Sequence, residues 1–428
     1  MQNSSNQGCV LILTNNYPCS SGEAFFEREA HWWGEEANDY SVWLFPSMCD
    51  LQPKRDFPPN LRVYERWSRA AVWKRVLLGL MEAPMGVLIA ELRVLAKKNA
   101  LGFRAVVNML ISCIKIGYHH HTLKQFVKEH GEISTIYCYW NNERSYAASL
   151  LKRDGSAHCV VSRIHRYDLY EEYRPDGYMP FKSYFVNRFD EVFPLSEKAA
   201  NYLELRYGAR PERLTVARLG VILPAKPQFN SVNRDRQLFL LSVSNCVPIK
   251  RIERIIDALV FAAKGAPNIQ FTWTHIGGGP LRLELERYAF NKFANLSNMS
   301  ADFLGEISNS EVRRFYADNR IDIFVNASDS EGVPVAIMEA MSFGIPVIAP
   351  DVGSVSELVG DDTGWLMPVD NIDENLGPCL LNATVSEKIT EKGRQARSRI
   401  ETSFDAERNY PQFVRYILQT VAGDEIGE

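Results

Sequence analysis

The chain has 428 residues, of which 46% are hydrophobic and 23% charged, with 48 lysines and arginines against 52 acidic residues. This ordinary composition excludes bulk disorder, and a chain of this length is expected to fold as two domains. No apolar run reaches the ~20 residues of a transmembrane helix, and the run at 9–13 is too short for a signal-peptide core. We therefore expect a cytoplasmic protein.

Eight cysteines are scattered along the chain, and none of them forms a C-x-x-C pair. This pattern argues against a zinc site and against a disulfide framework in a chain this long. Reduced, mostly buried thiols and no bound metal are expected.

The segment 66–128 differs from the rest of the chain in charge. It contains eleven bases and two acids, so its net charge is +9 and that of the remainder is −13. Apolar runs alternate with the bases at roughly helical spacing, as in basic amphipathic helices on an anionic membrane. Solvated, partly buried helices without lipid contact fit the same pattern. The segment is too apolar for a nucleic-acid surface.

The first half of the chain alternates between strand and helix patterns. The run 9–14 predicts a buried strand, a turn-rich stretch follows as far as Gly22, and a helix begins near Glu23. A Rossmann domain begins with a strand, a turn and a helix in this order. Continued alternation of strands and helices predicts a doubly wound parallel sheet. Further predicted strands are 40–45, 135–139, 159–162 and 191–195, and further predicted helices are 143–152 and 197–207.

The second half repeats this alternation after a Pro- and Asn-rich linker at 223–237. It predicts a second α/β unit, with Rossmann-like domains over 1–222 and 223–403. Predicted strands are 238–243, 270–276, 322–325 and 346–349. Predicted helices are 251–263, 281–290, 334–343 and 404–420, the last of them interrupted near its start by Pro411.

The stretch NASDSEGVPVAIMEAMSFGIPVIAP carries the most specific chemistry. Pro334 suits the first position of a helix, and Gly344 suits its left-handed end. The helix start would present unpaired amide donors to an anion such as a diphosphate. These donors are the amides of Gly332, Val333 and Val335.

Two carboxylates flank this helix start, Glu331 just before it and Glu339 about two turns along it. A carboxylate beside a phosphate site costs electrostatic energy, so the pair suggests recognition of hydroxyl groups, which donate to carboxylates. A sugar and a ribose would supply such hydroxyls.

The E-x7-E spacing of this pair, within EGVPVAIMEAMSFGIPVIAPDVGSVSELV, resembles the retaining GT-B enzymes of glycosyltransferase family 4. The similarity extends through VSNCVPIKRIERIIDAL, HIGGGPLRLELE, FLGEISNSEV and TGWLMP. The N-terminal half is similar less closely, through YPCSSGEAFFEREA, SRIHRYDLYEE, PLSEKAANYL and RLGV. These motifs resemble those of the bacterial family members that build exopolysaccharides, capsules and O-antigens.

The resemblance implies an α/β GT-B fold, with two Rossmann-like domains facing a cleft and the helix 404–428 packing back on the first domain. It implies retaining transfer of a hexose from a UDP- or GDP-sugar to a saccharide acceptor, without metal or cofactor. The acceptor would be lipid-linked, which would explain the basic apolar segment 66–128. The enzyme would act in bacterial surface polysaccharide or lipopolysaccharide synthesis, in the cytoplasm or peripherally on the inner face of the membrane.

Residue roles also follow from the resemblance. Glu339 would bind the ribose hydroxyls, Glu331 would hold the donor sugar, and Lys250 would stabilise the departing nucleotide. His165 would face the donor and hold the sugar or the acceptor, with Arg163 and Asp168 on the acceptor side. The remaining donor contacts are Gly22, Asn245, Arg251, Gly277, Gly279, Leu304, Gly305, Glu306, Gly332, Val333, Pro334 and Val335.

One position departs from the family, which usually has an arginine where this chain has Asn245. One phosphate-binding cation is therefore missing, and Arg251 or Arg254 could replace it. This departure keeps open a second hypothesis, a catalytically inactive sugar-nucleotide-binding or scaffold subunit of the same fold.

Two other enzyme classes fit less well. GGGPLR resembles a dinucleotide fingerprint, but Arg282 takes the place of its third glycine and no acidic residue in a strand-end context follows at ~20 residues. Asp329-Ser330-Glu331 is the nearest approach to the Asp-x-Asp of metal-dependent transferases. Its position just before a helix start fits a phosphate-binding site better than the metal-binding motif of such transferases.

Overall fold

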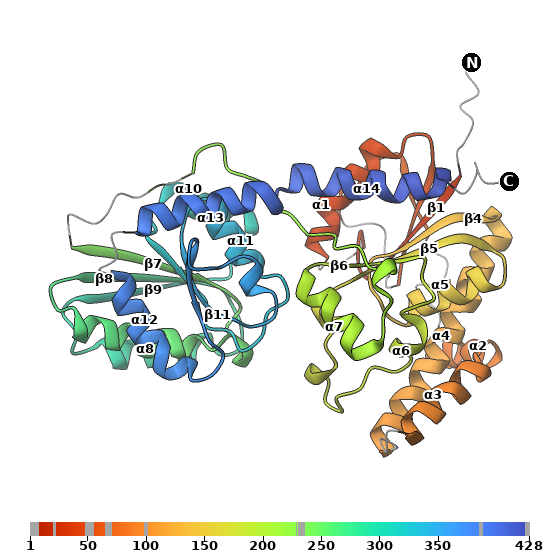
Figure 1. Ribbon diagram of the computed structural model, residues 1–428, viewed down its shortest axis with the longest axis horizontal. Coiled ribbons are helices and arrows are strands. Elements are labelled where there is room, and N and C mark those ends of the chain that lie inside the picture. The colour runs from red at the N-terminus through yellow and green to blue at the C-terminus, as the bar shows by residue number, and fades with distance from the viewer. Residues whose placement is uncertain are drawn as a thin grey trace. The chain divides into compact units, whose positions relative to one another are not determined.

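The computed structural model describes residues 8–19, 23–47, 55–64, 71–97, 102–227, 229, 236–384 and 388–423. The chain divides into two compact units, which Figure 1 shows with their elements labelled. The N-terminal unit comprises Met1–Arg218 and Tyr410–Glu428, and the C-terminal unit comprises Leu219–Asn409. The boundary near the C-terminus therefore falls inside the last helix, α14 (Ala406–Gly423).

The N-terminal unit contains a parallel sheet in the order β3-β2-β1-β4-β5-β6. Chain order reverses between β1 and β4, which are hydrogen-bonded neighbours. The strands are β1 (Cys9–Thr14), β2 (Ser41–Pro46), β3 (Leu61–Val63), β4 (Ile133–Cys138), β5 (Ala157–Ile164) and β6 (Glu191–Pro194). The helices are α1 (Ala24–Glu36), α2 (Val72–Met81), α3 (Met85–Lys97), α4 (Phe103–His130), α5 (Glu143–Arg153), α6 (Lys182–Phe185) and α7 (Glu197–Tyr207).

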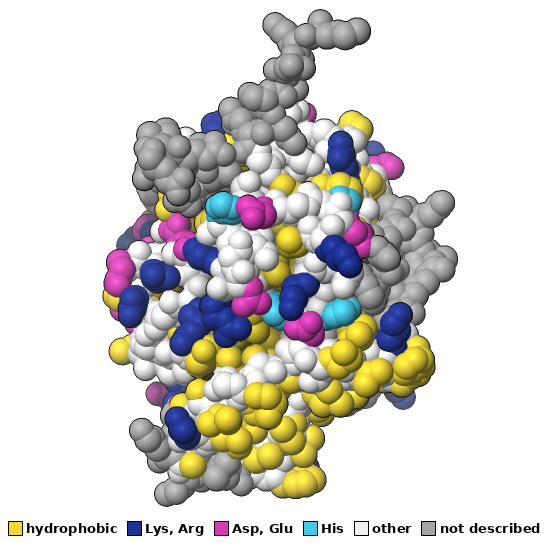
Figure 2. Space-filling view, turned by 90° about the vertical axis from the view of Figure 1, so that its right-hand side faces the viewer, with side chains coloured by type: hydrophobic (Ala, Val, Ile, Leu, Met, Phe, Trp, Pro, Cys, Tyr) yellow, Lys and Arg dark blue, Asp and Glu magenta, His cyan; other side chains and the backbone are white. Residues whose placement is uncertain are grey.

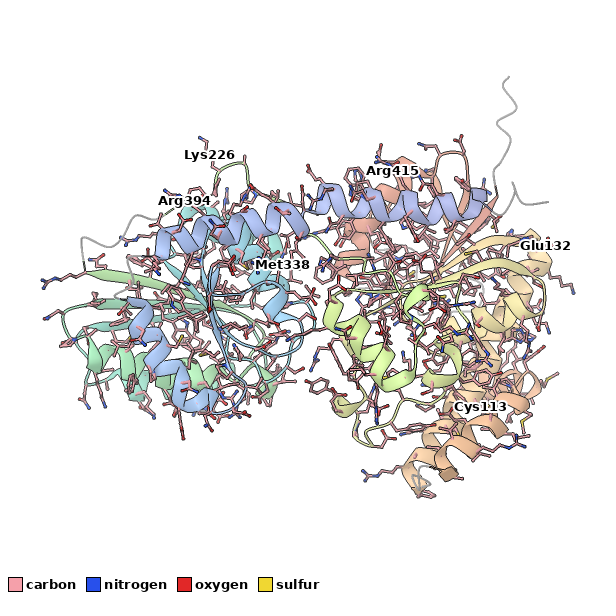
Figure 3. All side chains as sticks on the ribbon, in the orientation of Figure 1. Cys113, Glu132, Lys226, Met338, Arg394 and Arg415 are labelled. Carbon is pink, nitrogen blue, oxygen red and sulfur yellow. The ribbon has the colours of Figure 1, made fainter. Side chains whose placement is uncertain are left out.

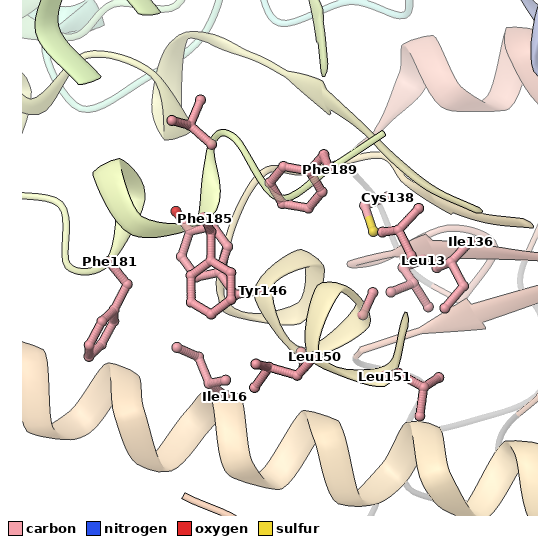
Figure 4. Close-up of a cluster of buried hydrophobic side chains, with 14 of the residues drawn as sticks. Leu13, Ile116, Ile136, Cys138, Tyr146, Leu150, Leu151, Phe181, Phe185 and Phe189 are labelled. Atoms are coloured by element: carbon pink, nitrogen blue, oxygen red, sulfur yellow. The ribbon is translucent and has the colours of Figure 1, made fainter. Parts of the chain in front are cut away.

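Both faces of this sheet are buried, which is why its strands are apolar along their length. Successive side chains point to opposite faces, so Leu11 and Leu13 join the cluster beneath α4 and α5. Figure 4 shows this cluster, in which Ile116 of α4 points toward Tyr146 of α5. Val10 and Ile12 pack on the other face, against α1 and α14.

The C-terminal unit contains a second parallel sheet, in the order β12-β11-β10-β7-β8-β9. Its chain order reverses between β7 and β10, which are hydrogen-bonded neighbours. Met338, labelled in Figure 3, lies in the hydrophobic core of this unit. The strands are β7 (Gln237–Val243), β8 (Gln270–Ile276), β9 (Met299–Gly305), β10 (Ile323–Val325), β11 (Val347–Pro350) and β12 (Gly364–Met367). The helices are α8 (Ile252–Gly265), α9 (Arg282–Phe293), α10 (Asn309–Asp318), α11 (Val335–Ser342), α12 (Ile372–Thr384) and α13 (Ile389–Ser403).

The predicted pair of doubly wound parallel sheets is confirmed. Two helix details differ from the prediction. Pro334 precedes α11 rather than starting it, because its ψ of 109° is extended, and its carbonyl accepts the first helical hydrogen bond from Met338. Pro411 lies inside α14, which continues through it. The predicted linker 223–237 lies partly outside the described residues.

The expectation of reduced thiols is wrong at Cys19, which is disulfide-bonded to a partner outside the described residues. No C-x-x-C spacing signals this bond in the sequence. Six other cysteines are free, namely Cys9, Cys113, Cys138, Cys159, Cys246 and Cys379. Across the part of the chain that the structure describes, no helix has both the length and the apolar character needed to cross a membrane.

Candidate functional site in the C-terminal unit

The site forms at the carboxyl ends of β7 and β10, where the order of the second sheet reverses. Ligands of open α/β sheets bind at such reversal points. The loops after the two strands are joined by a hydrogen bond of 2.9 Å from the Asp329 amide to the Ile249 carbonyl. This bond brings Lys250, from the first loop, beside Glu331, from the second.

Lys250 and Glu331 form an ion pair, with Nζ of the lysine 2.6 Å from Oε1 of the glutamate. Nδ2 of Asn326 donates to the same oxygen at 3.1 Å. Glu331 is buried, so its carboxylate needs these donors to offset its desolvation. The lysine side chain is more exposed than the glutamate and can reach a ligand from this position.

The segment after Glu331 presents backbone amides at the start of α11. Val335 is the first residue of α11, so its N–H has no partner within the helix, and Gly332 and Val333 lie just before the helix start. The loop after β11 packs tightly here, because the Ser354 amide donates to the Gly332 carbonyl at 3.1 Å. Gly353 permits this approach with a φ of 54°, since a Cβ there would lie 1.9 Å from the Glu331 carbonyl oxygen.

Glu339 is the fifth residue of α11, and its side chain is buried. Its Oε1 accepts a hydrogen bond of 3.1 Å from Nδ2 of Asn309, at the start of α10. An oriented carboxylate of this kind can accept hydrogen bonds from a pair of adjacent hydroxyl groups. The sequence analysis missed the supporting residues Asn309 and Asn326. Asn309 lies in a motif that carries the resemblance, and Asn326 begins the stretch with the most specific chemistry.

Glycines bring the ends of β7, β8 and β9 together. Gly277 has a φ of 155°, and a Cβ there would lie 1.8 Å from the Ser244 carbonyl oxygen. Its amide donates to the carbonyl of Gly305, whose own φ is 75°. Gly279 approaches Cys246 in the same way. The exposed residues Leu304 and Glu306 flank this junction.

The cations suggested as replacements for the missing arginine are already paired. Arg254 bonds to both Asp329 and Asp373, and Arg251 lies 3.6 Å from Asp329 and 3.1 Å from Glu253. Asn245 is exposed in the loop after β7. Lys250 pairs with one carboxylate, that of Glu331, whereas Arg251 and Arg254 each lie beside two.

Candidate residues in the N-terminal unit

His165 lies at the end of β5 and is held by the loop after β4. Its Nε2 is 3.0 Å from the Tyr139 carbonyl, which can only accept, so the neutral ring carries its proton on Nε2. Burial and, to a smaller extent, the nearby charge of Arg163 lower the pKa of His165 to about 3. Asp168 accepts hydrogen bonds of 2.6 Å from the amides of His165 and Asn141.

The expectation that Arg163 faces the acceptor is wrong. Its side chain is fully buried and pairs with Glu29 of α1, which is also fully buried. Its guanidinium lies 4.0 Å from the ring centre of Phe413 on α14. The residue therefore binds two helices to the sheet instead of contacting a ligand.

Gly22 lies outside the described residues, but Glu23 beside it has an unexpected position. Its φ of 52° is left-handed, and its carboxylate accepts hydrogen bonds from the amides of Asn15, Asn16 and Tyr17. The loop after β1 thus forms an anion-binding turn that its own glutamate occupies. The first-turn preference for acids predicted only a helix start.

Family membership

The second sheet, its glycine junction and the Lys250–Glu331 pair all lie within the stretch that matches a known family. Residues 226–377 match the family described as Glycosyl transferases group 1. Within the described residues, no group of three or more His, Cys, Asp or Glu side chains could hold a metal ion.

A relative that the chain is similar to is the putative colanic acid biosynthesis glycosyltransferase WcaL of Salmonella typhimurium. It is 27% identical over 220 residues, which cover 49% of this chain and 51% of WcaL. The chain thus spans about half the length of the curated relatives it matches.

Two solved structures share the fold of both units. The lipopolysaccharide outer core galactosyltransferase WaaB matches with a TM-score of 0.69 at 14% identity, over 96% of this chain and 99% of WaaB. Anabaena HepE in complex with UDP and glucose matches with a TM-score of 0.59 at 16% identity, over 98% and 99%. The two Rossmann-like domains therefore have the GT-B fold.

Proposed function

We propose that the protein is a retaining glycosyltransferase that moves a hexose from a UDP- or GDP-sugar to a saccharide acceptor in bacterial surface polysaccharide synthesis. The observation that carries this proposal is the Lys250–Glu331 pair at the reversal point of the second sheet, beside the amides that start α11. The UDP and glucose bound to HepE support a nucleotide-sugar donor.

The chemistry follows from charge. The bond between the anomeric carbon and the β-phosphate oxygen breaks, and negative charge develops on the leaving nucleotide. Lys250 and the amides of Gly332 and Val333 would stabilise that charge. The acceptor hydroxyl forms the new bond on the same face of the sugar, and its proton passes to the departing phosphate oxygen. Glu331 would accept hydrogen bonds from sugar hydroxyls and keep the ring in place.

No residue of this set serves as a covalent nucleophile in the proposal. His165 is neutral at physiological pH, so it would position the sugar or the acceptor rather than supply a positive charge. The positive charge comes from Lys250 and backbone amides, and we therefore propose that turnover requires no metal ion.

Transfer is tested by incubating the protein with UDP- and GDP-hexoses and measuring nucleotide release and glycoside formation. Release with the native sequence, and its loss in Glu331→Gln, would support the enzyme. The anomeric configuration of the product, read by NMR, tests retention. Nucleotide binding without release or transfer would favour the inactive subunit.

The membrane is proposed as a second partner, through α2, α3 and α4. Figure 2 shows hydrophobic side chains crowded over these helices, with lysines and arginines beside them. We name this area the apolar helix surface. It consists of Val72, Trp73, Val76, Leu77, Leu80, Met81, Met85, Ile89, Val94, Phe103, Leu110 and Ile111, all of them exposed.

The charge of this region favours an anionic leaflet. Exposed bases such as Lys74, Arg93 and Arg104 lie on the same helices. Apolar side chains inserted at the headgroup level, with bases beside them, bind anionic lipids through area and charge together. We therefore propose a cytoplasmic protein that contacts the inner membrane face peripherally, and a lipid-linked acceptor fits that location.

A further inference from the structure

Glu23 has a backbone conformation and a side-chain direction that a helix start does not require. It is the residue before α1, where a side-chain oxygen commonly caps the helix, yet its carboxylate makes no capping bond to that helix. Its φ of 52° and ψ of 38° are left-handed, a conformation that a residue with a Cβ keeps only when its surroundings enforce it. The contacts of the carboxylate supply that constraint.

The Glu23 carboxylate is saturated with hydrogen bonds from two loops. Its Oε1 accepts from the Asn15 amide at 2.8 Å and from the indole Nε1 of Trp140. Its Oε2 accepts from the amides of Asn16 and Tyr17, both at 2.7 Å. Two carboxylate oxygens have about four lone-pair sites, so these donors leave none for a substrate or a transferred proton. Glu23 is therefore suited to holding the loops in place and not to contacting a ligand.

The two loops that Glu23 joins follow β1 and β4, the neighbouring strands at which the chain order of the first sheet reverses. Residues 15–17 follow the end of β1, and Trp140 lies two positions after the end of β4. Backbone pairing joins these strands as far as the bond of 3.1 Å from the Tyr139 amide to the Leu13 carbonyl. The Glu23 carboxylate continues the connection beyond that bond.

Trp140 carries this constraint to His165. The centres of the indole and imidazole rings lie 4.6 Å apart, with an angle of 44° between their planes. The imidazole is also held by the Tyr139 carbonyl, which lies 3.0 Å from its Nε2. A hydrogen bond at the indole N–H restricts the rotamer of Trp140, and the packed indole then limits the orientations open to the imidazole.

We propose that Glu23 is a built-in anion that positions Trp140 and, through it, His165. Successive amides and one indole N–H converge on the carboxylate and hold it as they would hold a bound anion. Because the carboxylate is recognised by these neutral donors, a free carboxylate of the same shape can replace it. The effect of Glu23 on turnover rests on the proposed glycosyl transfer, in which His165 positions the sugar or the acceptor. Its effect on Trp140 is independent of that function.

Chemical rescue of the full-length protein tests this inference. Glu23→Gly removes the carboxylate and tolerates the left-handed backbone, and propionate has the atoms that the substitution deletes. The indole N–H signal of Trp140, assigned by comparison with Trp140→Phe, is followed by NMR on protein with labelled tryptophan. We expect the signal to move upfield in Glu23→Gly and to return when propionate is added. Turnover should fall by about tenfold or more, mainly in kcat, and propionate should restore most of it.

Two controls separate this role from general effects of charge. Sodium chloride at the ionic strength of the propionate should not restore the indole signal. Glu27→Ala removes another acid from the first turn of α1, where Glu27 is 46% exposed and pairs with Arg55. This variant should leave the indole signal and turnover unchanged. An indole signal that Glu23→Gly does not move, or that propionate restores no better than chloride, would overturn the inference.

A second variant keeps the test decisive if Glu23→Gly does not fold. Glu23→Gln keeps the size of the side chain but turns an NH₂ group toward donors, so the Trp140 signal should again move upfield. An unmoved signal in Glu23→Gln would also overturn the inference. Absence of turnover in the native protein would refute the proposed transfer, and the indole signal would still decide the role of Glu23.

Discussion

Lys250 Nζ lies 2.6 Å from Glu331 Oε1, and the two residues come from loops after different strands, 81 positions apart. The pair shows that one contact fixes two elements of the proposed donor site. A ligand phosphate would share the lysine with Glu331 rather than displace it, because an ammonium has three donors. The buried glutamate would then remain neutralised before, during and after donor binding.

Removing this lysine should affect both stability and turnover. Lys250→Ala removes the ion pair of the buried Glu331 carboxylate and leaves its hydrogen bond from Asn326, so we expect a loss of about 1–3 kcal/mol in unfolding free energy. Glu331→Gln should cost less, because an amide oxygen still accepts from both donors. Turnover should fall at least about 100-fold in each variant. Denaturant titration and steady-state kinetics on both variants and their double mutant measure the coupling between Lys250 and Glu331. Additive effects of the two substitutions on stability would contradict this coupling.

The neutral state of His165 predicts a pH dependence of stability. Its pKa is about 3 in the folded chain and about 6.5 when unfolded, so its contribution is full above pH 6.5 and is lost as pH falls toward 3. Between pH 7.5 and 5 we expect a loss of roughly 1–2 kcal/mol from this residue. His165→Asn should remove that part of the slope, whereas His158→Asn, at an exposed histidine, should not. Denaturant midpoints at pH 7.5 and pH 5 measure this loss of stability in the native protein and in both variants. An equal loss in all three proteins would refute the depressed pKa of His165.

Metal removal should leave turnover unchanged. Lys250 and the amides before α11 supply positive charge at the proposed leaving group, so a divalent cation is not needed for that role. We expect activity in excess EDTA to stay within about twofold of the untreated protein. A loss of activity that magnesium or manganese restores would show that the protein side chains do not suffice.

Features of the site that depend on the local sequence could be predicted, and those that depend on contacts between distant segments could not. Pro334 and Gly344 mark the limits of α11 to within a residue, because each reflects a backbone preference. The roles of Asn309 and Asn326 could not be predicted, since they depend on which loops meet in space. The role expected for Arg163 was wrong for the same reason: it shares a motif with His165, but its position in β5 buries its side chain in the core.

The fold shows the same division between local and distant signals. Apolar strands such as β1 and β11 were predicted closely, because parallel strands buried on both faces are continuous apolar runs. β9 was missed because three of its seven residues are exposed and its sequence resembles a loop. β3 has only three residues, too few to give any period.

Membrane contact should depend on the apolar helix surface. Trp73 is 70% exposed and Phe103 is 85% exposed, so serine at both positions should leave the fold intact and weaken sedimentation with anionic liposomes several-fold. Leu205→Ser is the matched control, because Leu205 is 90% exposed on α7, away from that surface. Binding should also fall with added salt. If the double variant sediments like the native protein, this surface does not bind lipid.

The central claim is that the C-terminal unit binds a nucleotide through Glu339, and calorimetric titration with UDP, GDP and ADP tests it most directly. Glu339→Gln is compared with Asp322→Asn, which alters a buried carboxylate at the opposite end of β10. The account predicts micromolar binding of one nucleotide to the native protein and to Asp322→Asn, with affinity at least about tenfold lower in Glu339→Gln. Absence of binding to any nucleotide, or equal affinity in both variants, would contradict it.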